Sequence, residues 1–260
     1  MQVWKRLADW AGRLRSIEGQ AIGFVPTMGA LHRGHASLVE RCRPENQIVI
    51  ASIFVNPTQF NDARDLERYP RTLEKDLALL ESLGVDDVLA PSSAELYPQG
   101  YGFRVEGDSL TGLMEGRYRT GFLQGVMTVV LKLFNLVRPG HAYFGEKDYQ
   151  QLLAIRGMVE DFLLPVEIVG CPTVREPSGL AESSRNRLLS AAAREKAACL
   201  FRALSTAPTP GEARKRIEAE GLTVEYLEEH WGRRFAAAHL EGVRLIDNVP
   251  LSAPAPQTSR

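Results

Sequence analysis

The chain has 260 residues, of which 44% are hydrophobic and 24% charged, and its formal net charge is −1 at pH 7. These values suit a globular protein of one or two domains, and the near-zero net charge argues against a broad nucleic-acid-binding surface. The three cysteines are far apart and form no CxxC pair, so we expect free thiols rather than disulfides or a zinc site. Neither a signal-peptide core nor an apolar run of ~20 residues is present, so we expect a cytoplasmic protein without membrane spans.

Strand and helix patterns alternate through the first two-thirds of the chain. Apolar, β-branched runs typical of buried strands alternate with segments of helical apolar spacing. The expected strands are residues 21–27, 48–55, 87–90, 142–145 and 166–169, and the expected helices are 34–43, 73–83, 125–137 and 149–162. This order predicts an α/β fold with a doubly wound, Rossmann-like parallel sheet, which would bind ligands at the carboxyl ends of its strands.

The pattern changes after about residue 172. Two helical segments and one late strand are expected at 190–204, 211–220 and 243–246. We therefore predict a Rossmann-like domain over residues 1–171 and a second, smaller α+β domain over residues 172–260. The terminal segment SAPAPQTSR is expected to be disordered.

The most informative segment is PTMGALHRGH at residues 26–35, which joins the first predicted strand to the first predicted helix. Backbone N–H groups and the helix dipole at such a position favour an anion. Gly29 and Gly34 let a ligand approach the backbone closely. His32 and His35 can lie on one helix face and stabilise charge on a phosphoryl group. A metal-binding pair stays open as an alternative, although no third or fourth ligand is evident.

Amide side chains follow two other predicted elements. Asn56 and Gln59 come directly after the strand at 48–55, so they belong to the carboxyl edge of the predicted sheet. An uncharged glutamine can bind hydroxyl and carboxylate oxygens while leaving the carboxylate nucleophilic. Gln151, in the first turn of the helix at 149–162, is expected to face the same site.

Three further sets of side chains suit the binding of a nucleoside triphosphate. Lys147 would bring positive charge to the phosphates, and Asp148 would accept hydrogen bonds from the ribose or nearby amides. The sequence Ser183–Ser184–Arg185 offers two hydroxyls and a fixed cation, which suits a phosphate clamp. Magnesium needs only one or two carboxylates besides phosphate oxygens, and Asp76 is the candidate among the nearby acids.

The HxGH arrangement resembles the signature of the nucleotidyltransferase superfamily, whose enzymes attack the α-phosphate of ATP and release pyrophosphate. Five more segments extend the likeness, in order along the chain. They are VNPTQF, YPRTLEKD, FGEKDYQQL, REPSGLAESSRN and RLIDN. Together the six segments resemble the pantothenate synthetase family along nearly the whole chain.

The resemblance implies an AMP-forming ligase that joins pantoate to β-alanine through a pantoyl-adenylate, with ATP as co-substrate and Mg²⁺. It also implies a homodimer, a small C-terminal lid domain, pantoate held by Gln59, Gln151 and Asn56, and His35 as proton donor. The other catalytic residues it suggests are His32, Lys147 and Arg185. The residues expected at ATP are Met28, Gly29, Ala30, Leu31, His32, Arg33, Gly34, His35, Gly145, Glu146, Lys147, Asp148, Val174, Glu182, Ser183, Ser184 and Arg185.

Three features depart from the family pattern. Phe122 stands where the family usually has a histidine, Glu182 stands where an apolar residue usually precedes Ser-Ser-Arg, and the C-terminal domain is shorter than usual. Two other functions stay open: an adenylyltransferase acting on a nucleotide or phosphopantetheine, and a nucleotide-binding regulator without activity. The paired glutamines argue against the first, and pantoate-dependent release of pyrophosphate would separate all three.

Overall fold

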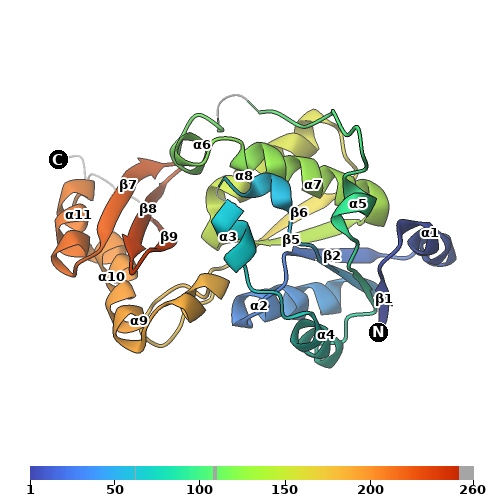
Figure 1. Cartoon of the computed structure of the whole chain (residues 1–260), viewed down its shortest axis with the longest axis horizontal. Helices are drawn as coiled ribbons and strands as arrows, with labels where there is room; N and C mark the ends of the chain where they lie inside the picture. Colours follow the sequence, from blue (N-terminus) through green and yellow to red (C-terminus); the bar gives the residue numbers. More distant parts are fainter. Residues whose placement is uncertain (62, 108–109, 252–260) are drawn as a thin grey trace, which may run out of the picture. The chain divides into compact units, whose positions relative to one another are not determined.

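The computed structural model describes residues 1–61, 63–107 and 110–251 (Figure 1). The chain divides into two compact units, Met1–Thr173 and Val174–Arg260. The boundary lies close to the one expected at residue 171. The disorder expected for residues 252–260 concerns residues outside the described part of the chain.

The first unit is built on a six-stranded parallel sheet in the order β1-β4-β3-β2-β5-β6. The strands are β1 Gln2–Trp4, β2 Ile22–Thr27, β3 Ile48–Ile53, β4 Asp87–Leu89, β5 His141–Gly145 and β6 Glu167–Cys171. From β2 the chain adds β3 and β4 on one side, and later β5 and β6 on the other. The predicted doubly wound sheet is confirmed, and its switch point lies at the carboxyl ends of β2 and β5, where such sheets bind ligands.

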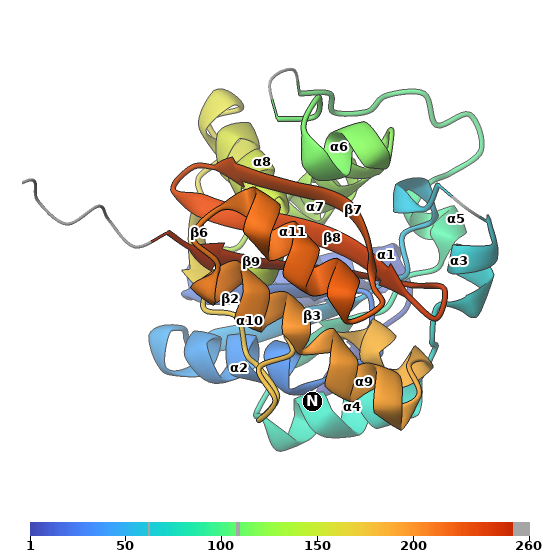
Figure 2. The ribbon, with the colours of Figure 1, turned by 90° about the vertical axis from the view of Figure 1, so that its left-hand side faces the viewer.

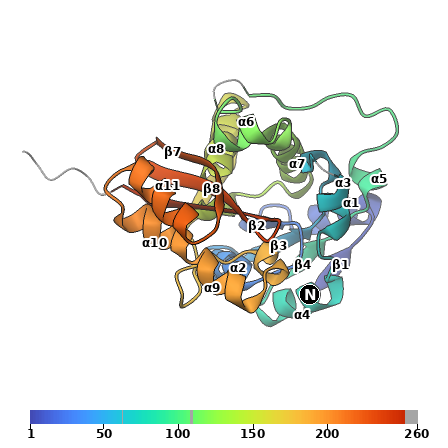
Figure 3. The ribbon, with the colours of Figure 1, turned by 60° about the vertical axis from the view of Figure 1, so that its left-hand side comes forward.

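Helices cover both faces of this sheet, with α2 and α4 on one face and α7 and α8 on the other (Figures 1 and 3). Alternation along the strands explains the two layers, since Phe24 packs with one core and Val25 with the other. The helices are α1 Leu7–Ser16, α2 Arg33–Cys42, α3 Ala63–Arg68, α4 Leu73–Ser82, α5 Ser93–Leu96, α6 Met114–Tyr118, α7 Phe122–Val137 and α8 Tyr149–Asp161. Three short 3-10 helices are η1 Arg43–Glu45, η2 Pro57–Gln59 and η3 Glu146–Asp148.

The second unit packs helices against a three-stranded antiparallel sheet in the order β7-β8-β9 (Figure 2). Its elements are η4 Ser184–Leu188, α9 Ala191–Ala197, α10 Cys199–Thr206, α11 Pro210–Ala219, β7 Thr223–His230, β8 Arg233–Leu240 and β9 Val243–Pro250. The expected α+β character is confirmed, but only the last of the three strands was predicted. The alanines of β8 are weak β formers, yet Ala236 and Ala238 are fully buried in the core of this unit.

All three cysteines are free, as the sequence predicted, and all three are buried. Burial raises the pKa of Cys42 to about 12 and those of Cys171 and Cys199 to about 11, so these thiols are uncharged at neutral pH. Among the described residues, no helix has the length and apolar character needed to cross a membrane.

Candidate active site

A buried carboxylate holds the turn that follows β2. Gly29 and Ala30 both have left-handed backbone conformations, with φ of 76° and 52°. Asp76, at the start of α4 and only 3% exposed, accepts the Ala30 N–H at 2.9 Å through Oδ2 and the Leu31 N–H at 2.8 Å through Oδ1. The Thr72 hydroxyl lies 3.1 Å from both carboxylate oxygens. Since a left-handed alanine costs about 1–2 kcal/mol, these bonds offset the strain of the turn.

This geometry corrects two interpretations of the sequence. The Ala30 and Leu31 N–H groups bond to Asp76, so they do not point toward a ligand as the motif suggested. The oxygens of Asp76 are already engaged by three donors, which does not favour the magnesium role expected for this residue. We assign Asp76 to the turn instead of to a metal.

The two histidines of the motif cap helix α2 reciprocally. His32 is the N-cap, and its Nδ1 accepts the Gly34 N–H at 3.1 Å. His35, in the first turn, accepts the His32 N–H through Nδ1 at 3.4 Å, and the ring centroids lie 4.1 Å apart. The pair therefore satisfies two N–H groups that a helix N-terminus otherwise leaves without partners.

The same contacts fix where each imidazole carries its proton. An Nδ1 atom that accepts a backbone N–H bears no hydrogen, so the tautomer assigned from this geometry has the proton on Nε2. On this assignment each ring carries an Nε2–H donor. Such donors at the carboxyl end of β2 suit the oxygens of a phosphoryl group.

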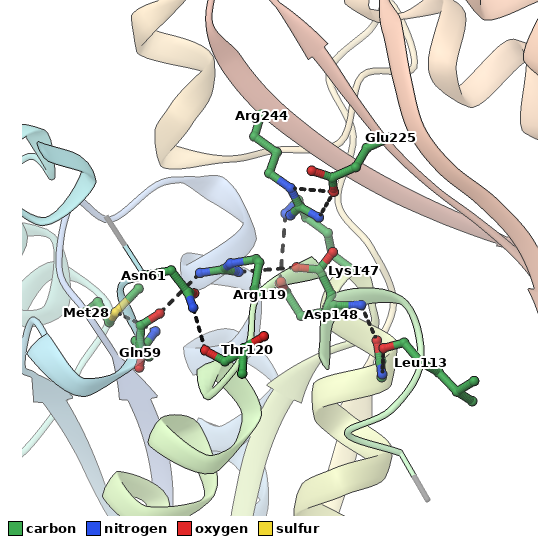
Figure 4. Close-up of polar contacts among 12 residues, drawn as sticks. Met28, Gln59, Asn61, Leu113, Arg119, Thr120, Lys147, Asp148, Glu225 and Arg244 are labelled. Atoms are coloured by element: carbon green, nitrogen blue, oxygen red, sulfur yellow. Dashed lines mark hydrogen bonds and ion pairs between the residues drawn. The ribbon is translucent and has the colours of Figure 1, made fainter. Parts of the chain in front are cut away.

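The amides of Asn56 and Gln59 are locked together after β3. Asn56 accepts the Thr58 N–H through Oδ1 and donates from Nδ2 to the Gly125 carbonyl at 3.1 Å. These two partners assign the oxygen and the nitrogen of the Asn56 amide. Asn56 Nδ2 also donates to Gln59 Oε1 at 3.0 Å. The Gln59 NH₂ group is therefore turned toward the Met28 sulfur, 2.9 Å away (Figure 4). Because a thioether is a weak acceptor, this NH₂ group suits an oxygen of a bound acid.

Arg119, which motif reasoning did not single out, holds the backbone of Gln59. Its Nη2 donates to the Gln59 carbonyl at 3.3 Å (Figure 4). Its Nη1 lies 3.2 Å from the Glu115 carboxylate, and its guanidinium carbon lies 3.6 Å from the centre of the Phe122 ring. Phe122, the departure from the family pattern, thus provides an aromatic face for a cation. The i,i+4 spacing of Glu115 and Arg119 was the available signal in the sequence.

Gly125 brings α7 into close contact with η2. A Cβ atom at this position would lie 2.5 Å from the Thr58 carbonyl oxygen and 2.9 Å from the Gln59 nitrogen. We expect Gly125→Ala to displace η2, lower the free energy of unfolding by about 1–3 kcal/mol and weaken acid binding. Gly157→Ala is the matched control, because α8 has open space there and the change should stabilise by up to about 1 kcal/mol. Urea unfolding of both variants checks this, and equal stabilities would contradict the close contact.

The two adjacent glutamines of α8 have different environments. Gln150 is buried and bonds to the Leu110 and Leu113 carbonyls and the Glu115 N–H, so it ties down the segment before α6. Gln151, the residue chosen from the sequence, is partly exposed in the first turn of α8. The buried neighbour is therefore structural, and Gln151 is the glutamine that can meet a ligand.

Lys147 and Asp148 lie in η3, directly after β5. Their charged groups are 3.9 Å apart, and the Lys147 side chain is 20% exposed. The position after β5 places Lys147 at the switch point of the sheet, beside the turn that follows β2. The sequence prediction of a cation near this edge agrees with that placement.

In the second unit, Ser183 caps η4 by accepting the Arg185 N–H at 3.3 Å. Ser184 and Asn186 are buried, and Asn186 donates to the Ala181 carbonyl. The segment is thus an ordered, capped 3-10 turn rather than an extended loop. The pKa of Arg194 is raised mainly by its hydrogen bond to Glu176. The negative charge of Glu182 raises it further.

A family model described as Pantoate-beta-alanine ligase matches residues 1–250. This chain belongs to the pantoate–β-alanine ligase family. The pantothenate synthetase of Bdellovibrio bacteriovorus is 49% identical over 250 residues, which cover 96% of this chain and 99% of that protein. The pantothenate synthetase of Legionella pneumophila (strain Corby) is 48% identical over 252 residues, covering 96% and 100%. The family resemblance of the six sequence segments is confirmed.

Solved structures of family members are similar in fold. The Francisella tularensis pantoate–β-alanine ligase, complexed with beta-gamma ATP and β-alanine, has a TM-score of 0.92 and 41% identity, covering 96% of this chain and 97% of that one. The Thermus thermophilus pantothenate synthetase has a TM-score of 0.88 and 45% identity, covering 96% and 99%. The fold, a six-stranded parallel sheet with helices and a small antiparallel sheet, is therefore that of this ligase family.

Proposed function

We propose that this chain condenses pantoate with β-alanine to give pantothenate, using ATP and passing through a pantoyl-adenylate. Family membership over residues 1–250 supports the reaction, as does the Francisella relative that holds a form of ATP together with β-alanine. One feature of the chain itself carries the proposal. Two Nε2–H donors follow β2, and the NH₂ group of Gln59 follows β3, the neighbouring strand of the sheet.

In the first step, a carboxylate oxygen of pantoate attacks the α-phosphorus of ATP. The bond between that phosphorus and the bridging oxygen breaks, and pyrophosphate leaves. His32 and His35 donate hydrogen bonds to the phosphoryl oxygens, and Lys147 offsets their negative charge. Gln59 and Gln151 hold the acid by uncharged amides, so the attacking carboxylate keeps its charge.

In the second step, the amine of β-alanine attacks the carbonyl carbon of the adenylate. The new C–N bond replaces the bond to the phosphate oxygen, AMP leaves, and the nitrogen loses a proton to become an amide. The chain contributes mainly by positioning the reactants and by keeping water away from the mixed anhydride.

Magnesium is proposed to enter with ATP, held by phosphate oxygens. Within residues 1–61, 63–107 and 110–251, no cluster of three or more His, Cys, Asp or Glu side chains is arranged to hold a metal. The ATP contacts of residues 28–35, 145–148, 174 and 182–185 stay predictions, apart from the two amides that Asp76 engages. A homodimer and a cytoplasmic location also stay predictions.

The two glutamines give a selective test of the acid site. We expect Gln59→Ala and Gln151→Ala each to raise the KM for pantoate by about 5- to 150-fold, because a lost partner of a buried group costs about 1–3 kcal/mol. The KM for ATP should stay unchanged. Initial rates with either substrate varied provide the measurement, and a change in the ATP constant alone would show that the acid site is elsewhere.

Product analysis tests the reaction itself. With ATP, pantoate and β-alanine together, pantothenate, AMP and pyrophosphate should form in equal amounts. An adenylyltransferase would instead form a dinucleotide-like product from a nucleotide or phosphopantetheine without an amine. A regulator would bind ATP but release no pyrophosphate, so either result would reject the proposal.

A further inference from the structure

The Tyr97 hydroxyl makes a partly buried contact with Asn56 that the proposed mechanism does not use. Tyr97 directly follows α5, and its hydroxyl donates to Asn56 Oδ1 at 2.8 Å. The Thr58 hydroxyl donates to the same oxygen at 2.9 Å. Asn56 itself is 1% exposed, so these bonds replace solvent around its carbonyl.

The Tyr97 ring is held from several sides. Lys132 of α7 donates from Nζ to the Leu96 carbonyl at 2.7 Å and lies 4.9 Å from the centre of the Tyr97 ring. Phe54 and Tyr101 flank the ring, with centroid distances of 6.2 Å and 5.0 Å. Burial raises the pKa of Tyr97, so its hydroxyl keeps the proton that it donates. The hydroxyl is therefore a fixed donor aimed at Asn56.

Hydrogen bonds relay this orientation to Gln59. Asn56 Oδ1 accepts from the Tyr97 hydroxyl and from the Thr58 N–H and hydroxyl, and Nδ2 donates to the Gly125 carbonyl, so the other Nδ2 hydrogen is directed toward Gln59 Oε1. Gln59 then presents its own NH₂ group on the opposite side. If the Asn56 amide turned over, Gln59 would offer an oxygen instead of a donor, and two electronegative atoms would face each other when an acid binds.

We propose that Tyr97 is a positioning residue for the acid substrate: together with Thr58 and the Gly125 carbonyl it holds the Asn56 amide, so that Gln59 stays oriented as a hydrogen-bond donor. This inference rests on the proposed function, because it takes Gln59 to bind pantoate. Tyr97 itself contacts neither substrate in this scheme. Its removal should therefore change the affinity for pantoate and leave the affinity for ATP unaltered.

The test uses Tyr97→Phe, which keeps the ring and removes only the hydroxyl. Pyrophosphate release should show a KM for pantoate raised about three- to tenfold, the effect of one hydrogen bond, with an unchanged KM for ATP. Tyr101→Phe is the matched control, since the Tyr101 ring packs beside Tyr97 but the relay does not involve its hydroxyl. We expect that control to match the unmodified chain.

A double variant separates positioning from general stability. In a Gln59→Ala background, Tyr97→Phe should not change the KM for pantoate further, because the Gln59 amide that Tyr97 is proposed to orient is absent. A further rise in that background, or no rise in the unmodified background, would overturn the inference while leaving the proposed function intact. If the unmodified chain released no pyrophosphate with pantoate, the proposed function would fail first, and the inference with it.

Discussion

We expect His35→Asn to lower kcat by about 10²–10³-fold while leaving the fold and the pantoate KM in place. The loss follows from removing one preorganised donor to the transferred phosphoryl group. The choice of asparagine separates two roles of the side chain. Its Oδ1 can stand near the position of the imidazole Nδ1 and accept the His32 N–H, so the helix cap is kept while the Nε2–H is lost.

A second substitution at the same residue, His35→Gln, is the control. His35→Gln can place an amide N–H near the position of Nε2 but gives up the bond at Nδ1, so it should keep more activity than His35→Asn and lose more stability. Steady-state kinetics and thermal unfolding of the two variants provide the measurement. Equal kcat values in folded His35→Asn and the unmodified chain would remove His35 from the chemistry.

The second large effect is expected at Asp76. Asp76→Ala removes the acceptor of the buried Ala30 and Leu31 N–H groups, each at a cost of about 1–3 kcal/mol, so the free energy of unfolding should fall by about 2–6 kcal/mol. Activity should fall as well, because the turn that carries His32 loses its support. Urea unfolding monitored by circular dichroism measures the first effect.

Two comparisons make this result specific. Lys75→Ala changes the exposed neighbour on the same helix and should alter stability by less than about 0.5 kcal/mol. Magnesium titrations of the activity then separate the turn from a metal site. Unchanged stability of Asp76→Ala together with a higher magnesium requirement would restore the metal role that the sequence suggested for Asp76.

Local patterns in the sequence were sufficient for most of the first unit. The apolar runs of β2 and β3 and the strong helical spacing of α7 predicted those elements to within a few residues. The same patterns did not predict β7 and β8, because their acidic residues and alanines are weak β formers. Tertiary packing stabilises these two strands. Strand β1 and helix α1 were also missed, since α1 buries little besides Trp10.

The site shows the same division between local and distant information. His32, His35 and Gln59 follow strands directly, so their place at the carboxyl edge of the sheet could be predicted from order alone. The role of Asp76 could not, because it contacts a turn 46 residues away in the sequence. Tyr97 likewise reaches Asn56 across 41 residues. Contacts of this kind depend on how the helices cross the sheet, and one sequence carries no direct signal of them.

The adenylate is the central claim, and a single-turnover reaction without β-alanine tests it most directly. Enzyme mixed with ATP and pantoate should release a burst of pyrophosphate equal to the enzyme concentration and almost no AMP. Addition of β-alanine should then release AMP and pantothenate in the same amount. Pyrophosphate that appears only after β-alanine is added, or that appears without pantoate, would contradict the two-step mechanism proposed for this chain.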